Sequence, residues 1–469
     1  MNSAGKSNVL AGALVFGIFG LYLFWAHAWY RERLFHFDAA FYTFRVFQLD
    51  AIFYYHDRYI NALTQWVPIM ARRMGADLVG VARAYSMTLP LIQVAAAVGL
   101  FLWRRSAALP LLMLVAVLAS LRYRFFSPIS ETHMVLLFSS LYFLLVQFGR
   151  PGKKLVICSL AAIALVSISH PVGVLPIAIL WAFNFVTKSE RRERWLEMAG
   201  ILVLFGWRFV MAMGNSYESQ KLGVLKTVFS LPSKWGELVV PELLGNYLFG
   251  MHAVPWLVFV VCVVWLFTAG KKIWAVMSLV SAAVLLMLVL VTYSYISFPV
   301  YHMLEGYLSF VSLVWLVPLV LLYKAGERQW VVILSGLMLV SGMWSVRQVK
   351  PYYTAREHYI LEICRPWQEK GNKRLVMTME KFPWRQLWYH WAVPFESVLM
   401  TASKDKRSTA TLFFPEQAAN FELVQRESDY FFGPFEHLPM ELLDTNYFLF
   451  PRQPYLNISE SDLPRDFFQ

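Results

Sequence analysis

Long apolar runs alternate with short polar segments along most of this chain. A helix needs about 20 apolar residues to cross a hydrocarbon core of roughly 30 Å, so runs of this kind predict transmembrane helices. The fifth and sixth runs are separated only by "SHP" (169–171), which fits either two spans or one broken hairpin. We count eleven runs: 8–28, 83–103, 107–121, 134–148, 154–169, 171–187, 197–213, 252–270, 273–295, 306–323 and 329–346.

The positive charges between these runs predict the orientation. Lysine and arginine are enriched in short cytoplasmic segments of membrane proteins. With the N-terminus inside, the N-terminal tail and five short loops hold fourteen cations, whereas the four shorter outer loops hold five. The alternation persists across all eleven runs. We therefore expect the N-terminus inside the cell and the C-terminus outside.

Two long outer segments remain. The first, residues 29–82, contains two amphipathic stretches (37–54 and 58–75) that predict helices lying in the membrane interface. The second follows the last run. There "KRLVMTM" and "STATLFFP" favour strands and "WRQLWYHWAVPFESVLMTA" favours a helix. The predicted fold is an all-α polytopic membrane domain (1–346) followed by a small α/β extracytoplasmic domain (347–469).

Composition agrees with a multi-pass integral membrane protein, because 58% of the residues are hydrophobic and only 15% are charged. The net charge of +12 follows from the predicted topology and requires no nucleic acid as a partner. The three cysteines form neither a disulfide framework nor a zinc motif. The N-terminal apolar run lacks a convincing cleavage site, so we interpret it as a retained first span.

Acids and histidines gather where the predicted topology places the outer ends of the spans. Asp38 is distinctive, since "FHFDAAFYTF" (35–44) surrounds it with aromatic rings. A carboxylate in such a setting is expected to be partly desolvated, which raises the pKa of an acid and suits a general base. The other ionisable residues expected at this outer mouth are Asp50, Asp57, Arg122, Arg124, Glu131, His133, His170, Glu218, His302 and Glu305.

Arginines at membrane depth are candidate ligands for a lipid phosphate. Arg208 lies in "ILVLFGWRFVMAMG", and Arg122 and Arg124 lie in "RYRFFSPISETH", which also holds Glu131 and His133. For Arg208 the alternative is snorkelling to the outer surface, and Arg122 and Arg124 are equally compatible with simple anchoring to lipid headgroups.

Three further residues lie at predicted outer span ends, namely His170, His302 and Glu305. These residue types suit capping or packing. Histidine and glutamate also bind divalent metals, so a metal site stays an open alternative, although no standard metal-ligand spacing is present. No glycine-rich phosphate loop and no large cytosolic segment is evident. An activated donor would therefore have to come from within the membrane.

This arrangement resembles the GT-C superfamily of polyprenyl-phosphate-dependent glycosyltransferases. The resemblance lies in the architecture and in "FHFDAAFY", where Asp38 matches the acidic residue that the family keeps early in its first outer loop. It implies a bacterial inner-membrane enzyme with Asp38 as catalytic base and Glu131 as a second acid. The donor would be a polyprenyl-phosphate-linked sugar, and the acceptor hydroxyl would belong to a glycan, a lipid or a protein.

Under this resemblance the remaining candidates would bind substrate. Arg208, Arg122 and Arg124 would stabilise charge on the leaving phosphate, with His133, His170, His302 and Glu305 nearby, and a single displacement would invert the anomeric centre. Three alternatives remain open: an O-antigen ligase- or polymerase-like enzyme, which usually carries its large outer loop late in the chain; a transporter or flippase; and a non-catalytic membrane scaffold.

Overall fold

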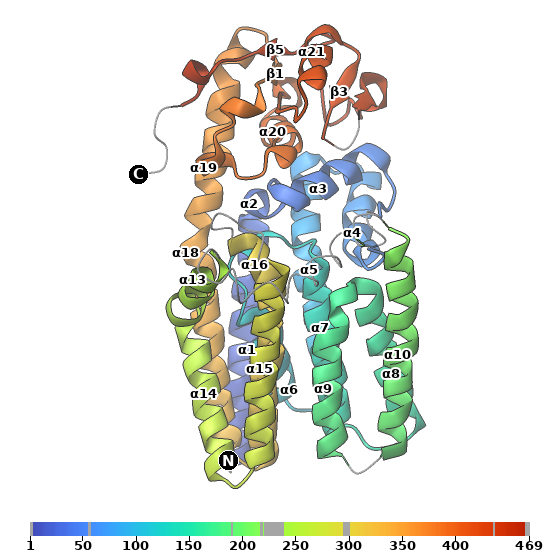
Figure 1. Cartoon of the computed structure of the whole chain (residues 1–469), viewed down its shortest axis with the longest axis vertical. Helices are drawn as coiled ribbons and strands as arrows, with labels where there is room; N and C mark the ends of the chain where they lie inside the picture. Colours follow the sequence, from blue (N-terminus) through green and yellow to red (C-terminus); the bar gives the residue numbers. More distant parts are fainter. Residues whose placement is uncertain are drawn as a thin grey trace.

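The computed structural model describes residues 3–54, 58–188, 191–215, 219, 239–293, 301–434 and 437–464. The molecule is elongated, with a helical bundle at one end and a mixed domain at the other (Figure 1). The N-terminus lies at the end of the bundle that is farthest from the C-terminal domain, which is also the end where the turn between α14 (Ala253–Thr268) and α15 (Lys272–Thr292) lies.

A helix occupies each of the eleven apolar runs. Besides α14 and α15, the bundle contains α1 (Ser3–Ala28), α5 (Leu78–Arg104), α6 (Ala108–Leu118), α7 (Glu131–Phe148), α8 (Lys153–Ser169), α9 (Val174–Thr187), α10 (Arg191–Met213), α16 (Tyr301–Leu308), α17 (Val311–Lys324) and α18 (Arg328–Glu369). Within the described residues, seven helical segments are long and apolar enough to cross a membrane. The chain is thus a helical polytopic membrane protein.

The remaining runs form shorter or bent helices, so the count of eleven spans stays a prediction. An eighth span results if α14 is counted with the preceding α13 (Val240–Gly245) and π-helix (Asn246–Met251), from which it is bent by 81°. The "SHP" break forms a short 3₁₀ turn, Pro171–Gly173, that separates α8 from α9. These are two distinct helices.

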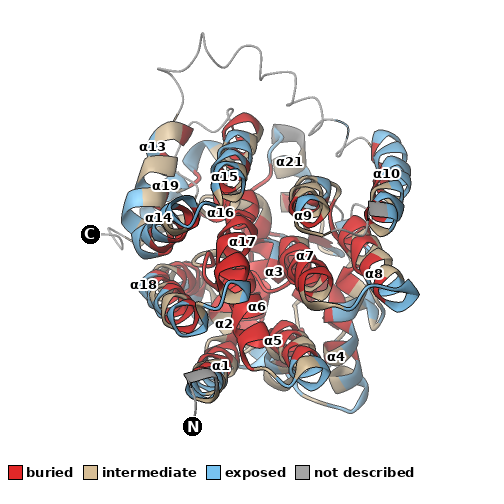
Figure 2. Cartoon of the chain, turned by 90° about the horizontal axis from the view of Figure 1, so that it is seen from below, coloured by how far each residue is buried: buried red, intermediate tan, exposed pale blue. Residues whose placement is uncertain are grey.

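The centre of the bundle is formed by α6 and α17. Every residue of α6 is buried, as are those of α17 from Val311 to Leu322. Figure 2 shows these two helices enclosed by their neighbours. A helix that is apolar on all sides can only be stable when protein surrounds it on all sides or when it is exposed to lipid. Helix α6 is short, about 16 Å for eleven residues, which suits a position enclosed by longer helices.

The first outer segment forms three helices, α2 (Tyr30–Leu34), α3 (Phe37–Leu49) and α4 (Asn61–Arg73). The two helices predicted for this segment are therefore present. In α4 the polar side chains of Asn61 and Gln65 are buried, whereas Leu63 and Trp66 are 45% and 58% exposed. An outward-facing apolar side is what a helix resting on a lipid surface requires.

The C-terminal domain is carried by α18, which is 42 residues, or about 63 Å, long and so extends well beyond a 30 Å hydrocarbon core. Strands β2 (Thr411–Phe413), β1 (Arg374–Val376) and β5 (Leu456–Asn457) form a parallel sheet in that order, and β3 (Tyr430–Phe432) pairs antiparallel with β4 (His437–Pro439). The domain also contains α19 (Trp384–Leu387), α20 (Val393–Ala402) and α21 (Ala418–Arg426).

These elements lie where the sequence predicted them. Both predicted strands are present as β1 and β2, and the predicted helix between them is divided into α19 and α20 by a short 3₁₀ turn, His390–Ala392.

Helix α3 shares a hydrophobic core with the C-terminal domain. The Phe44 ring lies 5.3 Å from Phe395, 5.2 Å from Phe431 and 5.5 Å from Phe448, measured between centroids. Phe47 lies 4.6 Å from Tyr447 in the same way. The first outer segment and the domain that begins some 300 residues later are therefore packed as one unit.

The predicted topology has a direct test. Because the α14–α15 turn and the C-terminal domain lie at opposite ends of the molecule, we expect reporter fusions at Gly270 and Gly371 to report the cytoplasm and the cell exterior, respectively. A cytoplasmic signal from Gly371 would contradict the orientation and would move every candidate site residue to the other side of the membrane.

Candidate functional site

Asp38 is exposed although its neighbours are buried. It lies in the first turn of α3, where Phe37, Ala39, Ala40 and Phe41 are all buried. The sequence-based expectation of a desolvated Asp38 is therefore wrong. The aromatic rings around it point into the core shared with the C-terminal domain, which leaves the carboxylate on the accessible side of the helix.

Tyr42 connects Asp38 to a second acid. Residues four apart lie on the same helix face, which places Tyr42 one turn after Asp38. Burial raises the pKa of the Tyr42 phenol well above its ordinary value, the negative charges of Glu131 and Asp38 raise it further, and Arg58 lowers it. Tyr42 is therefore a neutral hydroxyl at physiological pH. Its surroundings bring Asp38, Glu131 and Arg58 into one cluster, which we call the outer acidic site.

Glu131 is held at the start of α7. It occupies the first helical turn, where the helix dipole favours a negative charge. The amide Nδ2 of Asn61 donates a hydrogen bond to Glu131 Oε1 at 3.1 Å. The hydrogen bond from Asn61 orients Glu131 from α4, and because Glu131 is only half-buried its carboxylate stays accessible. Two carboxylates from distant parts of the chain thus lie around a common tyrosine.

Arg58 is a functional candidate that sequence reasoning missed. It lies just before α4 and is only 4% exposed, yet it is close enough to Tyr42 to affect the pKa of that phenol. The sequence suggested only that Arg58 lies on a polar face of a surface helix. A buried cation near Tyr42 is instead suited to binding an anionic group or to balancing nearby acids.

The loop that contains Arg122 and Arg124 is fixed by Glu305. The Glu305 carboxylate accepts hydrogen bonds from the backbone N–H groups of Arg122, of Tyr123 at 2.8 Å and of Arg124 at 3.2 Å. Glu305 is buried on α16. The structure therefore gives it a positioning role for this loop, in which both arginine side chains are only half-buried.

Arg124 is joined to the start of α7. Its Nη1 donates to Ser130 Oγ at 3.0 Å, and its carbonyl oxygen lies 3.0 Å from His133 Nε2. Ser130 and His133 flank Glu131, so the same loop sets the position of this acid. His302 contacts the residue before Asp38: its ring lies 4.9 Å from the Phe37 ring, and its Nδ1 lies 3.1 Å from the hydroxyl of Tyr353.

His170 and Arg208 lie at the end of α8 and on α10, two helices that pack together. His170 ends α8, where its Nδ1 accepts a hydrogen bond from the Val172 N–H at 3.1 Å. Arg208 is only 1% exposed, so it is directed into the protein. Its helix, α10, packs mainly on α8 and α9 at the edge of the bundle (Figure 2). The His170 ring lies 5.5 Å from the ring of Tyr307 on α16, the helix that carries Glu305.

The start of α3 is clamped by a buried ion pair of the C-terminal domain. Arg356 Nη2 lies 2.7 Å from Glu396 Oε2, and both side chains are fully buried. Glu396 Oε1 accepts a hydrogen bond from the Phe37 N–H at 2.7 Å, and the Arg356 guanidinium lies 4.7 Å from the Phe37 ring. Phe37 has φ of +52°, a left-handed conformation that costs a bulky residue roughly 1–3 kcal/mol. The residue before Asp38 is thus held in a strained conformation.

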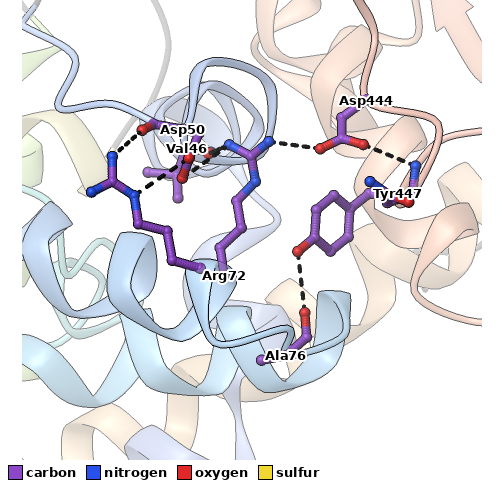
Figure 3. Close-up of polar contacts among 8 residues, drawn as sticks. Val46, Asp50, Arg72, Ala76, Asp444 and Tyr447 are labelled. Carbon is purple, nitrogen blue, oxygen red and sulfur yellow. Dashed lines mark hydrogen bonds and ion pairs between the residues drawn. The ribbon is translucent and has the colours of Figure 1, made fainter.

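A second contact fixes the other end of α3 (Figure 3). Arg72 donates to the Val46 carbonyl at 3.2 Å and forms an ion pair with Asp444 at 2.6 Å. The Tyr447 hydroxyl donates to the Ala76 carbonyl at 3.1 Å. The C-terminal domain therefore contacts both ends of the helix that presents Asp38.

His36 is not a proton donor at neutral pH. It is fully buried at the start of α3, and burial together with the nearby charges of Arg356 and Arg31 lowers the pKa of its imidazole well below the usual value. Among the described residues, no three histidine, cysteine, aspartate or glutamate side chains gather as a metal site would require. Two predicted mouth residues, Asp57 and Glu218, lie outside the described residues.

Comparisons with known proteins give no family. No protein-family model matches the chain, and no curated protein or solved structure matches it either. The chemistry of the outer acidic site must therefore be judged from its own residues.

The buried clamp predicts a large loss of stability in Glu396→Gln. The amide oxygen still accepts from the Phe37 N–H, but Arg356 loses its countercharge, and breaking a buried pair from one side costs about 3–5 kcal/mol. Thermal unfolding of the purified protein should show a markedly lower midpoint. The double variant Arg356→Met/Glu396→Gln should regain much of this loss because no buried charge is left unpaired.

The matched control is Asp444→Asn, which removes an acid from the partly exposed ion pair with Arg72. Its midpoint should fall less, since the pair is not fully desolvated and Arg72 keeps a second acid, Asp50, 3.5 Å away. Equal losses for Glu396→Gln and Asp444→Asn, or simple additivity in the double variant, would contradict the assignment of the clamp.

Proposed function

We propose that the protein is a GT-C-like membrane glycosyltransferase. It would transfer a sugar from a polyprenyl-phosphate donor to an acceptor hydroxyl of a glycan, lipid or protein, at the extracytoplasmic face of a bacterial inner membrane. The observation that carries the proposal is the exposed carboxylate of Asp38, which is grouped through Tyr42 with Glu131 and a buried arginine. This group lies between the helical bundle and the C-terminal domain (Figure 1).

Asp38 has the properties of the group that activates the acceptor. It is accessible, so a hydroxyl can approach it, and its backbone is fixed by the clamp at Phe37. As the hydroxyl attacks the anomeric carbon, its proton passes to the Asp38 carboxylate. General-base catalysis of this kind contributes about 10²–10⁴ in rate. One such displacement, with the phosphate leaving from the opposite face, inverts the anomeric centre.

The leaving phosphate needs positive charge. As the glycosidic bond breaks, negative charge grows on the phosphate oxygens, and fixed cations stabilise it in a site that excludes water. Arg58 is the cation grouped with Asp38, and the half-buried Arg122 and Arg124 lie on the loop that positions Glu131. Arg208, buried on α10, stays a predicted phosphate ligand.

The alternatives differ in what Asp38 does. An O-antigen ligase- or polymerase-like enzyme would also use a lipid-linked sugar and would depend on an outer carboxylate. A transporter is favoured by one feature, the 81° bend before α14, where the fully buried His252 lies. A transporter or a scaffold would form no glycan product, so substitution of Asp38 would leave no transferase activity to lose.

The direct prediction concerns Asp38→Asn. This change keeps size and hydrogen bonding but removes the base, so turnover from a polyprenyl-phosphate-linked sugar should fall at least about 10²-fold while donor binding is retained. Asp38→Glu should be nearly as inactive, because a displacement of about 1 Å at a reacting group is costly. Transfer of radiolabelled sugar by purified protein provides the measurement.

Asp50→Asn is the matched control. It makes the same change at the other end of α3, and asparagine tolerates the left-handed conformation of Asp50 (φ +48°). We expect its turnover to stay close to that of the wild type. Wild-type turnover in Asp38→Asn would remove Asp38 from the reaction and direct attention to Glu131 and His133.

The arginines predict a second contrast. Arg58→Lys keeps the charge but loses the planar guanidinium, so we expect at least about a tenfold loss in kcat/KM for the donor. Arg208→Ala tests the sequence-based assignment with the same assay. A loss of donor affinity in Arg208→Ala together with unchanged kinetics in Arg58→Lys would place the phosphate beside α10 and contradict its binding beside Asp38.

A further inference from the structure

A cavity lies at the end of the bundle opposite the C-terminal domain. Its volume is about 300 Å³, and residues from α1, from the turn between α5 and α6, from α17 and from α18 line it. Seen from this end, these helices are neighbours (Figure 2). The polar lining residues are Ser7, Asn8, Arg105, Ser106, Tyr323 and Arg328. This cavity is separate from the outer acidic site and does not depend on the proposed function.

The electrostatics of this cavity favour an anion. Arg105 and Arg328 both line it, and none of its lining residues is acidic. The N-termini of α1 and α18 also lie here and add partial positive charge from their unpaired N–H groups. Glu327, which precedes α18, is the acid adjacent in sequence and offsets only part of this charge.

The walls of the cavity are held in place by hydrogen bonds. Asn8 Oδ1 accepts a hydrogen bond from the Ala107 N–H at 2.8 Å, which ties α1 to the turn before α6. The hydroxyls of Ser106 and Tyr323 lie 3.3 Å apart, and the Arg328 guanidinium lies 5.6 Å from the Tyr323 ring. Part of the cavity wall is therefore arranged before a ligand binds, while the exposed Arg105 and Arg328 side chains lie at its edge.

Arg105 adopts a conformation that an arginine does not favour. It ends α5 with φ of +51° and ψ of +35°, a left-handed position usually filled by glycine or asparagine. At this position arginine makes the folded state less stable than glycine would, because its side chain disfavours the left-handed conformation. A ligand that binds the Arg105 side chain provides a physical reason for the residue.

We propose that this cavity binds the phosphate headgroup of an anionic phospholipid. Phosphate is the natural partner of two guanidinium groups beside helix N-termini. A lipid is favoured over free phosphate because exposed apolar residues follow the lining residues Asn8 and Arg328 in sequence, namely Val9 and Leu10 on α1 and Trp330 on α18, which are 62%, 42% and 54% exposed. The acyl chains would cover these side chains while the headgroup occupies the cavity.

The test compares lipid binding by wild type, Arg105→Asn and Arg328→Gln. Retention of phosphatidylglycerol relative to phosphatidylcholine is measured by native mass spectrometry of the detergent-purified protein. One arginine near a phosphate contributes about fivefold in affinity, so each variant should retain phosphatidylglycerol about fivefold less well. Arg104→Gln is the matched control, since Arg104 stacks 4.4 Å from the Trp103 ring and does not line the cavity.

Thermal unfolding provides a second test, in which Arg105→Asn should lose no stability although it loses lipid binding. In lipid-free detergent, Arg105→Asn should unfold at the same temperature as the wild type or higher, because asparagine relieves the left-handed strain. Added phosphatidylglycerol should raise the midpoint of the wild type and of Arg104→Gln, and much less that of Arg105→Asn. Inorganic phosphate at millimolar concentration should have little effect.

Three outcomes would overturn the proposal. The first is an equal phosphatidylglycerol response in all the variants and the wild type. The second is a loss in Arg104→Gln as large as that in Arg105→Asn, which would indicate general charge attraction. The third is full stabilisation by inorganic phosphate alone, which would identify a soluble anion as the ligand.

Discussion

The buried pair of Arg356 and Glu396 is the interaction on which the arrangement of the outer half depends. Two fully buried charges are costly unless each has a partner, and here the carboxylate is satisfied on both oxygens, by the guanidinium and by the Phe37 N–H. Because Phe37 lies directly before Asp38, the pair fixes the backbone from which the candidate base projects. The left-handed strain at Phe37 is sustained by the same contacts.

This constraint explains why the C-terminal domain is joined so closely to the first outer segment. The domain supplies Glu396 at the start of α3, the ring of Phe395 beside Phe41 and Phe44, and Asp444 for Arg72 near the end of the helix. The aromatic residues of α3 point into this joint core, so Asp38 is left as the accessible group. Positioning of a carboxylate from a rigid helix suits chemistry in which displacements of about 1 Å matter.

Much of the helical architecture follows directly from the sequence. The long apolar runs favour helices because a single segment satisfies all its own backbone hydrogen bonds inside a membrane only as a helix, and every run is helical. The strands β1 and β2 are short apolar segments bounded by turns, and they too were predictable. The shared core of α3 was not predictable. Apolar rings such as Phe41 and Phe44 on one side of a helix give the same sequence pattern whether a lipid surface or a distant domain covers them.

The candidate site was predictable only in part. Asp38 and Glu131 were chosen from their sequence neighbourhoods, and the structure places both near Tyr42. Arg58 was missed because no sequence pattern shows that an arginine just before a surface helix becomes buried near Tyr42. Arg208 is buried within an apolar helix, but periodicity along one helix does not indicate which neighbouring helices it meets, and its role as a phosphate ligand stays a prediction.

The most direct test of the central claim is a structure of the protein bound to a non-hydrolysable polyprenyl-phosphate sugar analogue. The proposed chemistry requires the sugar beside the Asp38 carboxylate, with the phosphate in contact with Arg58 or with the loop that contains Arg122 and Arg124. A sugar bound elsewhere in the protein, with no group of the donor near Asp38, would contradict it.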